Sequence, residues 1–214
     1  GTVESISQIN KEILYKCYNT FYNPSNMVLF TCGSVECDKV AALADKYVTA
    51  SPIGEIDRFY PVEPDEVNQS ETTQKLSVSS PIFLLGFKDC TAGEEGSLLL
   101  RRQILTEILL EMLVGKSSEI YNSLYEKGLI NQTFESDFTC EKGYAFTSMG
   151  GESPAPQKAR TELLRGIAET DLTQNNFDRC KKVIIGRYLR LFNSVEKLSN
   201  SFVSSIFRGV DLFE

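Results

Sequence analysis

The chain contains no histidine among its 214 residues. Histidine is the commonest general base and metal ligand in proteins, and it usually activates a catalytic serine or cysteine. A zinc hydrolase with imidazole ligands therefore cannot be built from this sequence alone. We expect no catalytic residue, no cofactor-binding residue and no metal ligand here, so any chemistry must be completed outside the chain.

Cysteine is the next residue type that could support chemistry, and the chain has six. Only Cys32 and Cys37 lie close together, and no pair has C-x-x-C spacing. A metal or redox pair at these two positions lacks further ligands at suitable spacing. We interpret the six as reduced thiols that pack as small hydrophobic residues in a cytoplasmic protein: Cys17, Cys32, Cys37, Cys90, Cys140 and Cys180.

Three short patterns imitate functional motifs. Residues 115–117 read G-K-S, as at the end of a phosphate-binding loop, but Leu110 stands where that loop needs glycine and a helix precedes it. A helix stop followed by a serine N-cap is the better interpretation. Glu94 and Glu95 could be an acid–base pair, but carboxylates also favour a helix start. We interpret residues 150–151, Gly-Gly, as a turn and not a ligand cradle.

The composition also limits the kinds of protein that the sequence can encode. Apolar residues make up 42% and charged residues 24%, as in a folded globular domain, and the net charge is −7. An acidic chain without a long basic cluster is a poor candidate for binding nucleic acid or an anionic membrane. Residues 98–114 are the longest apolar stretch, but five polar side chains interrupt it, so we expect a buried helix and no membrane span.

The N-terminal quarter predicts a helix, a strand and a second helix. Residues 11–22 have helical apolar spacing, with Asn10 as the N-cap. Residues 26–32 (NMVLFTC) predict a buried strand that ends at Gly33. The next helix would bury one face, formed by Val40, Leu43, Ala44 and Tyr47.

Residues 51–74 differ in character, being rich in proline and acids and lacking periodicity. They predict a long internal excursion, with one extended segment near residues 56–59. Strands are then expected at residues 75–79 and 81–88.

The remaining chain alternates helices with a hairpin. A buried helix is expected at residues 93–114, ending at a left-handed Gly115, and a shorter one at 118–127. Strands at residues 129–138 and 144–149 predict a hairpin.

The last third predicts three helices, beginning near Pro156, Thr173 and Ser194. Helices before and after central strands indicate an α+β two-layer sandwich, with one mainly antiparallel sheet and helices mostly on one face. We expect residues 1–214 to form a single domain, with residues 51–74 as its excursion.

Ordered blocks along the chain resemble the insulinase or pitrilysin family of metallopeptidases, closest to its bacterial processing-protease-like branch. The blocks are residues 1–6 (GTVESI), 21–27 (FYNPSNM), 33–35 (GSV), 115–130 (GKSSEIYNSLYEKGLI) and 193–198 (NSVEKL). They lie at the beginning, middle and end, so the resemblance spans nearly the whole chain.

The resemblance implies a fold, a role and partners. In this family similar α+β domains pair into two halves that enclose a peptide, and an inverted H-x-x-E-H motif binds zinc. The GTVESI block normally follows the catalytic domain. The resemblance therefore implies a noncatalytic, chamber-forming domain that is inactive in isolation, with zinc in the neighbouring catalytic domain of the same polypeptide. An opposing homologous half and a peptide substrate would be its partners. Because the chain begins at Gly1 without Met, we expect a piece of a longer protein.

One departure from the family pattern concerns substrate contact. The half opposite the zinc often carries an Arg and a Tyr in L-R-E-x-x-G-L-x-Y, where this chain has Tyr125 and Asn131. Neither is the family residue, so their role is not transferred, and a scaffold in the catalytic half is favoured.

The alternative from another class is a free-standing peptide-binding or assembly module. It would add a peptide strand to a sheet edge or to the hairpin at residues 129–149. A self-sufficient enzyme ranks third, because no Ser–Lys or carboxylate constellation is visible.

Overall fold

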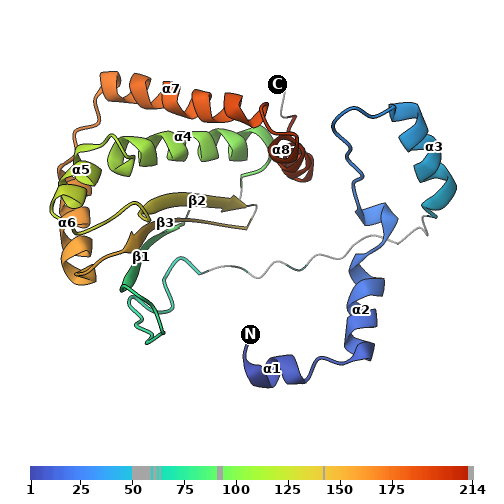
Figure 1. The fold of residues 1–214 in the computed structure, drawn as a ribbon, viewed down its shortest axis with the longest axis horizontal. Coiled ribbons are helices and arrows are strands. Elements are labelled where there is room, and N and C mark those ends of the chain that lie inside the picture. Colours follow the sequence, from blue (N-terminus) through green and yellow to red (C-terminus); the bar gives the residue numbers. More distant parts are fainter. Residues whose placement is uncertain (50–58, 60–61, 63, 91–93, 142, 212–214) are drawn as a thin grey trace. The chain divides into compact units, whose positions relative to one another are not determined.

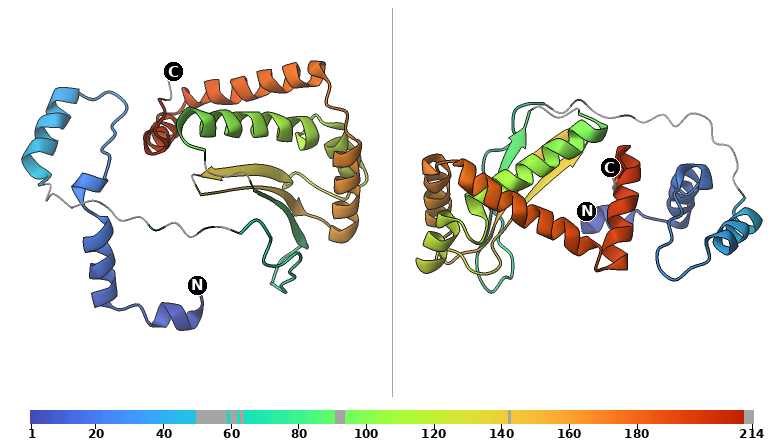
Figure 2. Two further views of the ribbon diagram at one scale, coloured as in Figure 1. Left: turned by 180° about the vertical axis from the view of Figure 1, so that it is seen from behind. Right: turned by 90° about the horizontal axis from the view of Figure 1, so that it is seen from above.

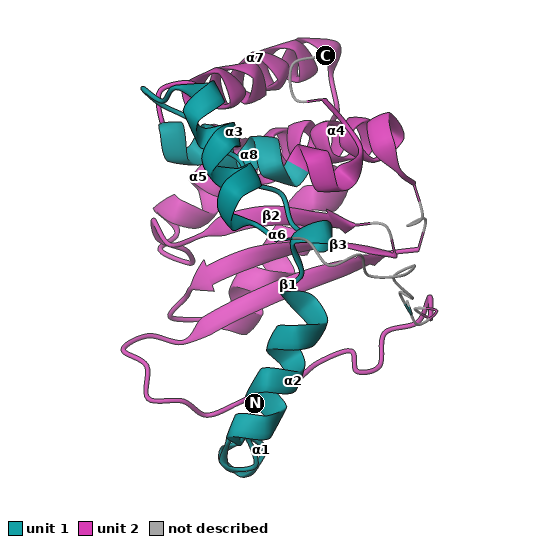
Figure 3. Cartoon of the chain, turned by 90° about the vertical axis from the view of Figure 1, so that its right-hand side faces the viewer, with its two compact units in different colours: residues 1–59, 195–204 teal, residues 60–194, 205–214 magenta. Residues whose placement is uncertain are grey.

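The computed structural model describes residues 1–49, 59, 62, 64–90, 94–141 and 143–211. The chain divides into two compact units, residues 1–59 with 195–204 and residues 60–194 with 205–214 (Figure 3). The expectation of a single domain over residues 1–214 stays a prediction. Within the predicted excursion, residues 56–58 lie outside the described residues, and residues 64–74 form neither helix nor strand.

The larger unit is built on an antiparallel sheet of strands β1 (Ile82–Asp89), β2 (Glu135–Glu141) and β3 (Tyr144–Glu152). Their order is β1-β3-β2, so the hairpin strand β3 lies in the middle (Figure 1). Leu85 lies opposite Met149, and Phe138 lies opposite Thr147. The predicted hairpin and the strand over residues 81–88 are confirmed, although β2 begins six residues later than predicted.

Helices α4 (Gly96–Val114), α5 (Glu119–Glu126) and α6 (Pro156–Glu169) cover one face of this sheet. The core between them contains apolar side chains of all six elements, among them Val114, Leu124, Phe138, Met149 and Leu163. Leu163 is completely inaccessible to solvent. The predicted α+β architecture, with helices packed on an antiparallel sheet, is therefore confirmed.

Helix α7 (Gln174–Leu191) packs on the side of α4 that faces away from the sheet (Figure 2). A second cluster fills this contact and includes Ile108 and Met112 of α4 with Cys180 and Ile184 of α7. Helix α4 is thus covered on two sides, as its broad apolar surface predicts. The coverage is incomplete, because Leu98, Leu105 and Leu109 remain exposed.

The smaller unit consists mainly of α1 (Val3–Ser7), α2 (Lys11–Phe21), the short 3₁₀ helix η1 (Pro24–Asn26) and α3 (Cys37–Tyr47). The first ten residues of α8 (Val195–Arg208) also belong to it, and the last four belong to the larger unit. The ring of Phe30 stacks on that of Phe202 in α8, with centroids 4.5 Å apart.

The predicted helix starts are confirmed where the cap residue satisfies a free backbone donor. Asn10 Oδ1 accepts the amide of Ile13 at 2.9 Å, and Thr173 Oγ1 accepts that of Asn176 at 3.3 Å. Pro156 occupies the first turn of α6. These signals are local, so they need no tertiary context.

Two predicted strands are wrong, at residues 26–32 and 75–79. Both segments contain β-branched or aromatic residues, but no strand among the described residues pairs with either. Strand propensity mostly reflects packing against neighbours, so a suitable sequence without a partner remains irregular.

The predictions at two glycine positions are also wrong. Gly115 is not left-handed, having φ −59°, but a Cβ there would lie 2.4 Å from the carbonyl oxygen of Glu111. Residues 150–151 are not a turn but part of β3. A Cβ on Gly150 would lie 2.0 Å from the carbonyl oxygen of Phe83, and one on Gly151 would lie 2.8 Å from the backbone of Phe134. These glycines are needed for close approach of the backbone.

Candidate functional site

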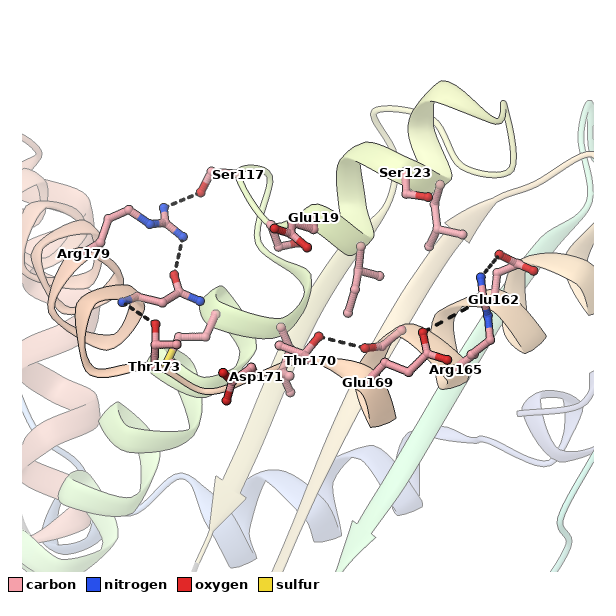
Figure 4. A pocket seen from close by; sticks show the side chains of 17 residues that line it. Ser117, Glu119, Ser123, Glu162, Arg165, Glu169, Thr170, Asp171, Thr173 and Arg179 are labelled. Carbon is pink, nitrogen blue, oxygen red and sulfur yellow. Dashed lines mark hydrogen bonds and ion pairs between the residues drawn. The ribbon is translucent and has the colours of Figure 1, made fainter.

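A polar cavity of about 660 Å³ lies among α5, α6 and α7 of the larger unit (Figure 4). Its rim includes Ser117, from the G-K-S segment, and the serine that caps α5. The Ser118 hydroxyl oxygen accepts the Tyr121 amide at 3.1 Å, and α4 precedes the segment. The predicted helix stop and serine N-cap are therefore confirmed, and a phosphate-binding loop is excluded because no strand leads into it.

Arg179 is the cation on one side of this cavity (Figure 4). It donates to Ser117 Oγ at 2.5 Å and to Asn176 Oδ1 at 2.8 Å. Its guanidinium therefore joins the loop before α5 to the first turn of α7. These bonds brace the two elements and use part of the hydrogen-bonding capacity of the guanidinium.

Glu162 is the acceptor on the opposite side. Its Oε2 accepts from Lys127 Nζ at 2.9 Å and from Arg165 at 2.8 Å. These two hydrogen bonds hold the pKa of Glu162 below its ordinary value, which is unfavourable for a general base that must take up a proton near neutral pH. Arg165 also lies 3.8 Å from Glu169. Around the cavity, paired charges join the end of α5 to α6, and the hydrogen bonds of Arg179 join the loop before α5 to α7. None of these contacts activates a nucleophile.

The carboxylates of Glu94 and Glu95 do not form an acid–base pair. Glu95 is the N-cap residue of α4. Glu94 lies 3.7 Å from Arg102, which also donates to both carboxylate oxygens of Asp89 at 2.6 Å. The helix-start interpretation is confirmed, with the ion pairs joining the end of β1 to α4.

The two positions that depart from the family pattern have structural contacts. The Tyr125 ring stacks on Tyr121 within α5, with centroids 5.9 Å apart. Asn131 donates to Glu152 Oε2 at 2.9 Å and accepts the amide of Thr133 at 2.9 Å, which stabilises the turn before β2. Both side chains therefore have local roles that need no substrate.

An open apolar surface, which was not predicted from the sequence, lies on the other face of the sheet. Ile82 and Leu84 of β1 and Tyr144 and Phe146 of β3 point to this face and are exposed, Leu84 by 77%. The rings of Tyr144 and Phe146 stack with centroids 6.3 Å apart. We call these four residues the open-face cluster. Consecutive apolar residues in β1 were the signal that could have located it, because successive residues of a strand face opposite sides of the sheet.

Acidic side chains extend the open face onto β2. Glu135, Asp137 and Glu141 lie opposite β3 residues that share this face. At one end, a cavity of about 960 Å³ is lined by Phe146, Lys88 and the segment around Asp65. An apolar surface bordered by carboxylates could hold an extended peptide, by contact with apolar side chains and by attraction of basic ones.

In the part of the chain that the structure describes, no group of three or more Cys, Asp or Glu side chains is arranged to hold a metal ion. None of the helices in this part is both long and apolar enough to cross a bilayer. All six cysteines are free thiols; Cys140 and Cys180 are buried, and burial raises the pKa of each thiol.

The α+β sandwich, in which the polar residues of the cavity brace helices, has the fold class that the sequence blocks imply. The family model described as "Peptidase M16 inactive domain" matches residues 8–184, so the chain belongs to this family. This match confirms the resemblance of the sequence blocks to the insulinase-type family.

Individual relatives of the chain are about twice as long as the chain itself. It is 37% identical over 219 residues to a protein of Bacillus subtilis (strain 168) described as "Uncharacterized zinc protease YmfH", and it covers 51% of that protein. A crystal structure of a putative M16-like peptidase from Alicyclobacillus acidocaldarius is 32% identical, with a TM-score of 0.87 over 97% of this chain and 50% of that one. A protease from Helicobacter pylori, 20% identical with a TM-score of 0.75 over 98% of this chain and 52% of that one, shares the fold. The chain thus spans about half the length of these relatives.

Proposed function

We propose that the chain is the noncatalytic, chamber-forming part of a longer zinc peptidase. Its partners would be a zinc-bearing catalytic domain in the same polypeptide and an opposing homologous half, and its substrate a peptide. The observation that carries this proposal is the match to an inactive peptidase domain in a chain half as long as its relatives. A chain without histidine cannot itself contain H-x-x-E-H.

The open-face cluster supports the chamber role. Four large apolar side chains remain exposed on one sheet face, although the opposite face is packed by helices. Ile82 and Leu84 lie toward one end of this face and Tyr144 and Phe146 toward the other, since Leu84 pairs with Gly150 and Phe146 with Lys88. Exposed apolar side chains bordered by polar groups are typical of binding surfaces. We assign this face to the chamber wall, where Leu84 and Phe146 would contact apolar side chains of the peptide.

The first test compares the chain alone with the longer polypeptide that contains it. Zinc content is measured by mass spectrometry after dialysis, and cleavage is followed with a library of fluorogenic peptides. We expect no stoichiometric zinc and no cleavage for the chain alone, and about one zinc per catalytic domain for the longer polypeptide. Stoichiometric zinc on the isolated chain would overturn the proposal.

The second test addresses the open face in the longer polypeptide. Leu84→Ser should raise KM for peptide cleavage several-fold and leave zinc content unchanged. Leu172→Ser is the matched control, because Leu172 is also exposed but lies between α6 and α7, away from the sheet. An equal KM for the two variants would contradict the assignment of the open face to the chamber wall.

The alternative function is a free-standing module that binds peptide by strand addition. It is favoured by one observation, that β1 and β2 each pair only with β3 among the described strands and so have one free edge. Peptide binding by the isolated chain, with new amide protection at β1 or β2 in hydrogen exchange, would select this alternative.

We also propose a cytoplasmic location. Six free thiols support a reducing compartment, because cysteines in oxidising compartments usually form disulfides. Fractionation of cells that express the full-length protein tests this, and recovery outside the cytoplasm would contradict it.

A further inference from the structure

The N-terminal segment, defined here as residues 1–49, forms helices without burying a side chain. No residue of α1, α2, η1 or α3 is buried. Large apolar side chains are exposed throughout, including Ile13, Leu14 and Phe21 of α2 and Tyr47 of α3. Burial of apolar side chains stabilises a folded protein, and residues 1–49 leave this stabilisation unrealised.

The exposed side chains are arranged on one side of each helix. They recur at helical spacing, as Leu14, Tyr18 and Phe21 on α2 and as Leu43 and Tyr47 on α3, where the partly exposed Val40 continues the stripe. The remaining surface is charged; for example, Lys39 in the first turn of α3 pairs with Glu36 at 2.7 Å. An apolar stripe opposite a charged face is typical of a helix that covers a packed surface. The apolar stripes of α2 and α3 are therefore suited to pack against another surface.

The run at residues 27–32 lies between these helices and has the composition of a strand. Met27 has extended backbone angles, φ −126° and ψ 154°. Leu29 is 67% exposed, and no strand among the described residues pairs with this run. Six residues are the usual length of a strand. The Met27 amide donates to the Pro24 carbonyl at 3.2 Å, so residues 28–32 are the part of the run that is suited to pair with a sheet edge.

One side of the run already has a contact, where Phe30 stacks on Phe202. In an extended strand successive side chains point to opposite sides, so Leu29 belongs to the other side. A helix–strand–helix unit with one unfilled side fits at the edge of an existing sheet, with the strand adding to that edge and the helices covering one face.

The length of the relatives indicates which polypeptide contains that sheet. This chain matches along its whole length, yet it covers only 51% of the Bacillus subtilis protein and 50% of the Alicyclobacillus acidocaldarius protein. An equal length of polypeptide therefore lies outside the match. A covalently attached neighbour also has a high effective concentration, which favours it over a second copy of this chain.

We propose that residues 1–49 complete the fold of the neighbouring catalytic domain: residues 27–32 add a strand to its sheet, and α2 and α3 cover that sheet. This inference rests on the proposed function for the identity of the neighbour. The family model spans residues 8–184 without a break, so the sequence match does not separate this segment from the sheet unit that follows. The structural boundary falls within the family domain.

Hydrogen exchange followed by mass spectrometry tests the proposal, on the chain alone and on the longer polypeptide. Amides of residues 28–32 should exchange about 100-fold more slowly in the longer polypeptide, because ladder bonds protect them. Leu29→Asp should reduce this protection about tenfold by placing a charge in the new core. Leu172→Asp, at an exposed position between α6 and α7, should leave it unchanged.

Several outcomes would overturn the proposal. Equal exchange in the two proteins would do so, as would strong protection in the chain alone, which would place the run against this chain's own residues. Protection that depends on chain concentration would instead identify a second copy as the partner.

Zinc content and peptide cleavage separate this inference from the proposed function. If the longer polypeptide cleaves peptides while residues 28–32 remain unprotected, the proposed function stands and the docking inference fails. If these residues are protected in a protein without zinc or activity, the docking stands and the proposed function fails.

Discussion

Replacement of Gly150 by alanine should destabilise the larger unit through a clash between two strands. Gly150 lies in the central strand β3, between Leu84 of β1 and Glu135 of β2. A Cβ at this position would lie 2.0 Å from the carbonyl oxygen of Phe83 and 3.0 Å from the Cα of Leu84. Both are backbone atoms, so a rotamer change cannot relieve the contact.

The magnitude follows from the movement that the new methyl group requires. Normal van der Waals contact requires β1 and β3 to separate by roughly 1 Å, which weakens about two ladder hydrogen bonds worth about 1 kcal/mol each. Overpacking adds about 1–3 kcal/mol. Alanine recovers about 0.5–1 kcal/mol relative to glycine within a strand. The net loss is about 3 kcal/mol, or roughly 10 °C in Tm for a unit of this size.

Urea denaturation followed by circular dichroism measures this loss, and a thermal melt checks it. Gly186→Ala is the control, because a Cβ at Gly186 of α7 has open space around it. Alanine should stabilise that helix by up to about 1 kcal/mol. If Gly150→Ala were as stable as the parent chain, the close approach of β1 to β3 would be refuted, together with the reason for glycine there.

Three further predictions concern the packing of the same unit. Leu163→Ala should cost about 3 kcal/mol in urea denaturation, because the side chain is fully buried and leaves a cavity. Arg187→Met should cost about 2 kcal/mol, because it leaves the buried carboxylate of Glu111 without its ion pair. Burial and the nearby Glu107 carboxylate raise the pKa of Tyr188 to about 12. The unfolded chain releases this proton near pH 10, so stability should fall between pH 10 and 12. In Tyr188→Phe the loss of unfolding free energy over this pH range should be smaller by about 1 kcal/mol, after allowance for solvent screening.

Each of these predictions has a control. For Leu163 it is Leu189→Ala, at an exposed position, which should cost under about 0.5 kcal/mol. The double variant Arg187→Met with Glu111→Met should recover much of the loss, and no recovery would exclude the unpaired charge as its cause. Tyr15→Phe should leave the alkaline loss intact, since Tyr15 is exposed; identical alkaline profiles for Tyr188→Phe and the parent chain would refute the assignment.

Helix boundaries were predictable from sequence because their causes lie within a few residues. Asn10, Ser118 and Thr173 each accept an amide three residues onward, and such bonds form wherever the helix starts. Gly128 has φ +64° after α5, as expected of a helix-ending glycine. Gly115 follows α4 for a different reason, because a Cβ there would clash with the carbonyl oxygen of Glu111, whereas its backbone φ of −59° does not require glycine.

Strands were less predictable because their partners are distant. The same apolar, β-branched character marks residues 82–89 and 27–32, but only the first has β3 beside it. Likewise, the apolar run of residues 81–88 could locate β1 but could not indicate that its outer side stays exposed at Leu84. Exposure depends on which other elements, inside or outside this chain, cover a face.

The sequence by itself determined that this chain supplies no histidine ligand to a metal, where most of its helices begin and end, and which family it belongs to. These properties depend on residue identity and on bonds spanning a single helical turn. Only the tertiary structure decided that the polar groups around α5, α6 and α7 brace helices, that Gly150 and Gly151 allow backbones to approach, and that residues 27–32 have no strand partner among the described residues. Those properties depend on atoms brought together from distant parts of the chain, and in the last case on a surface that we assign to its neighbour.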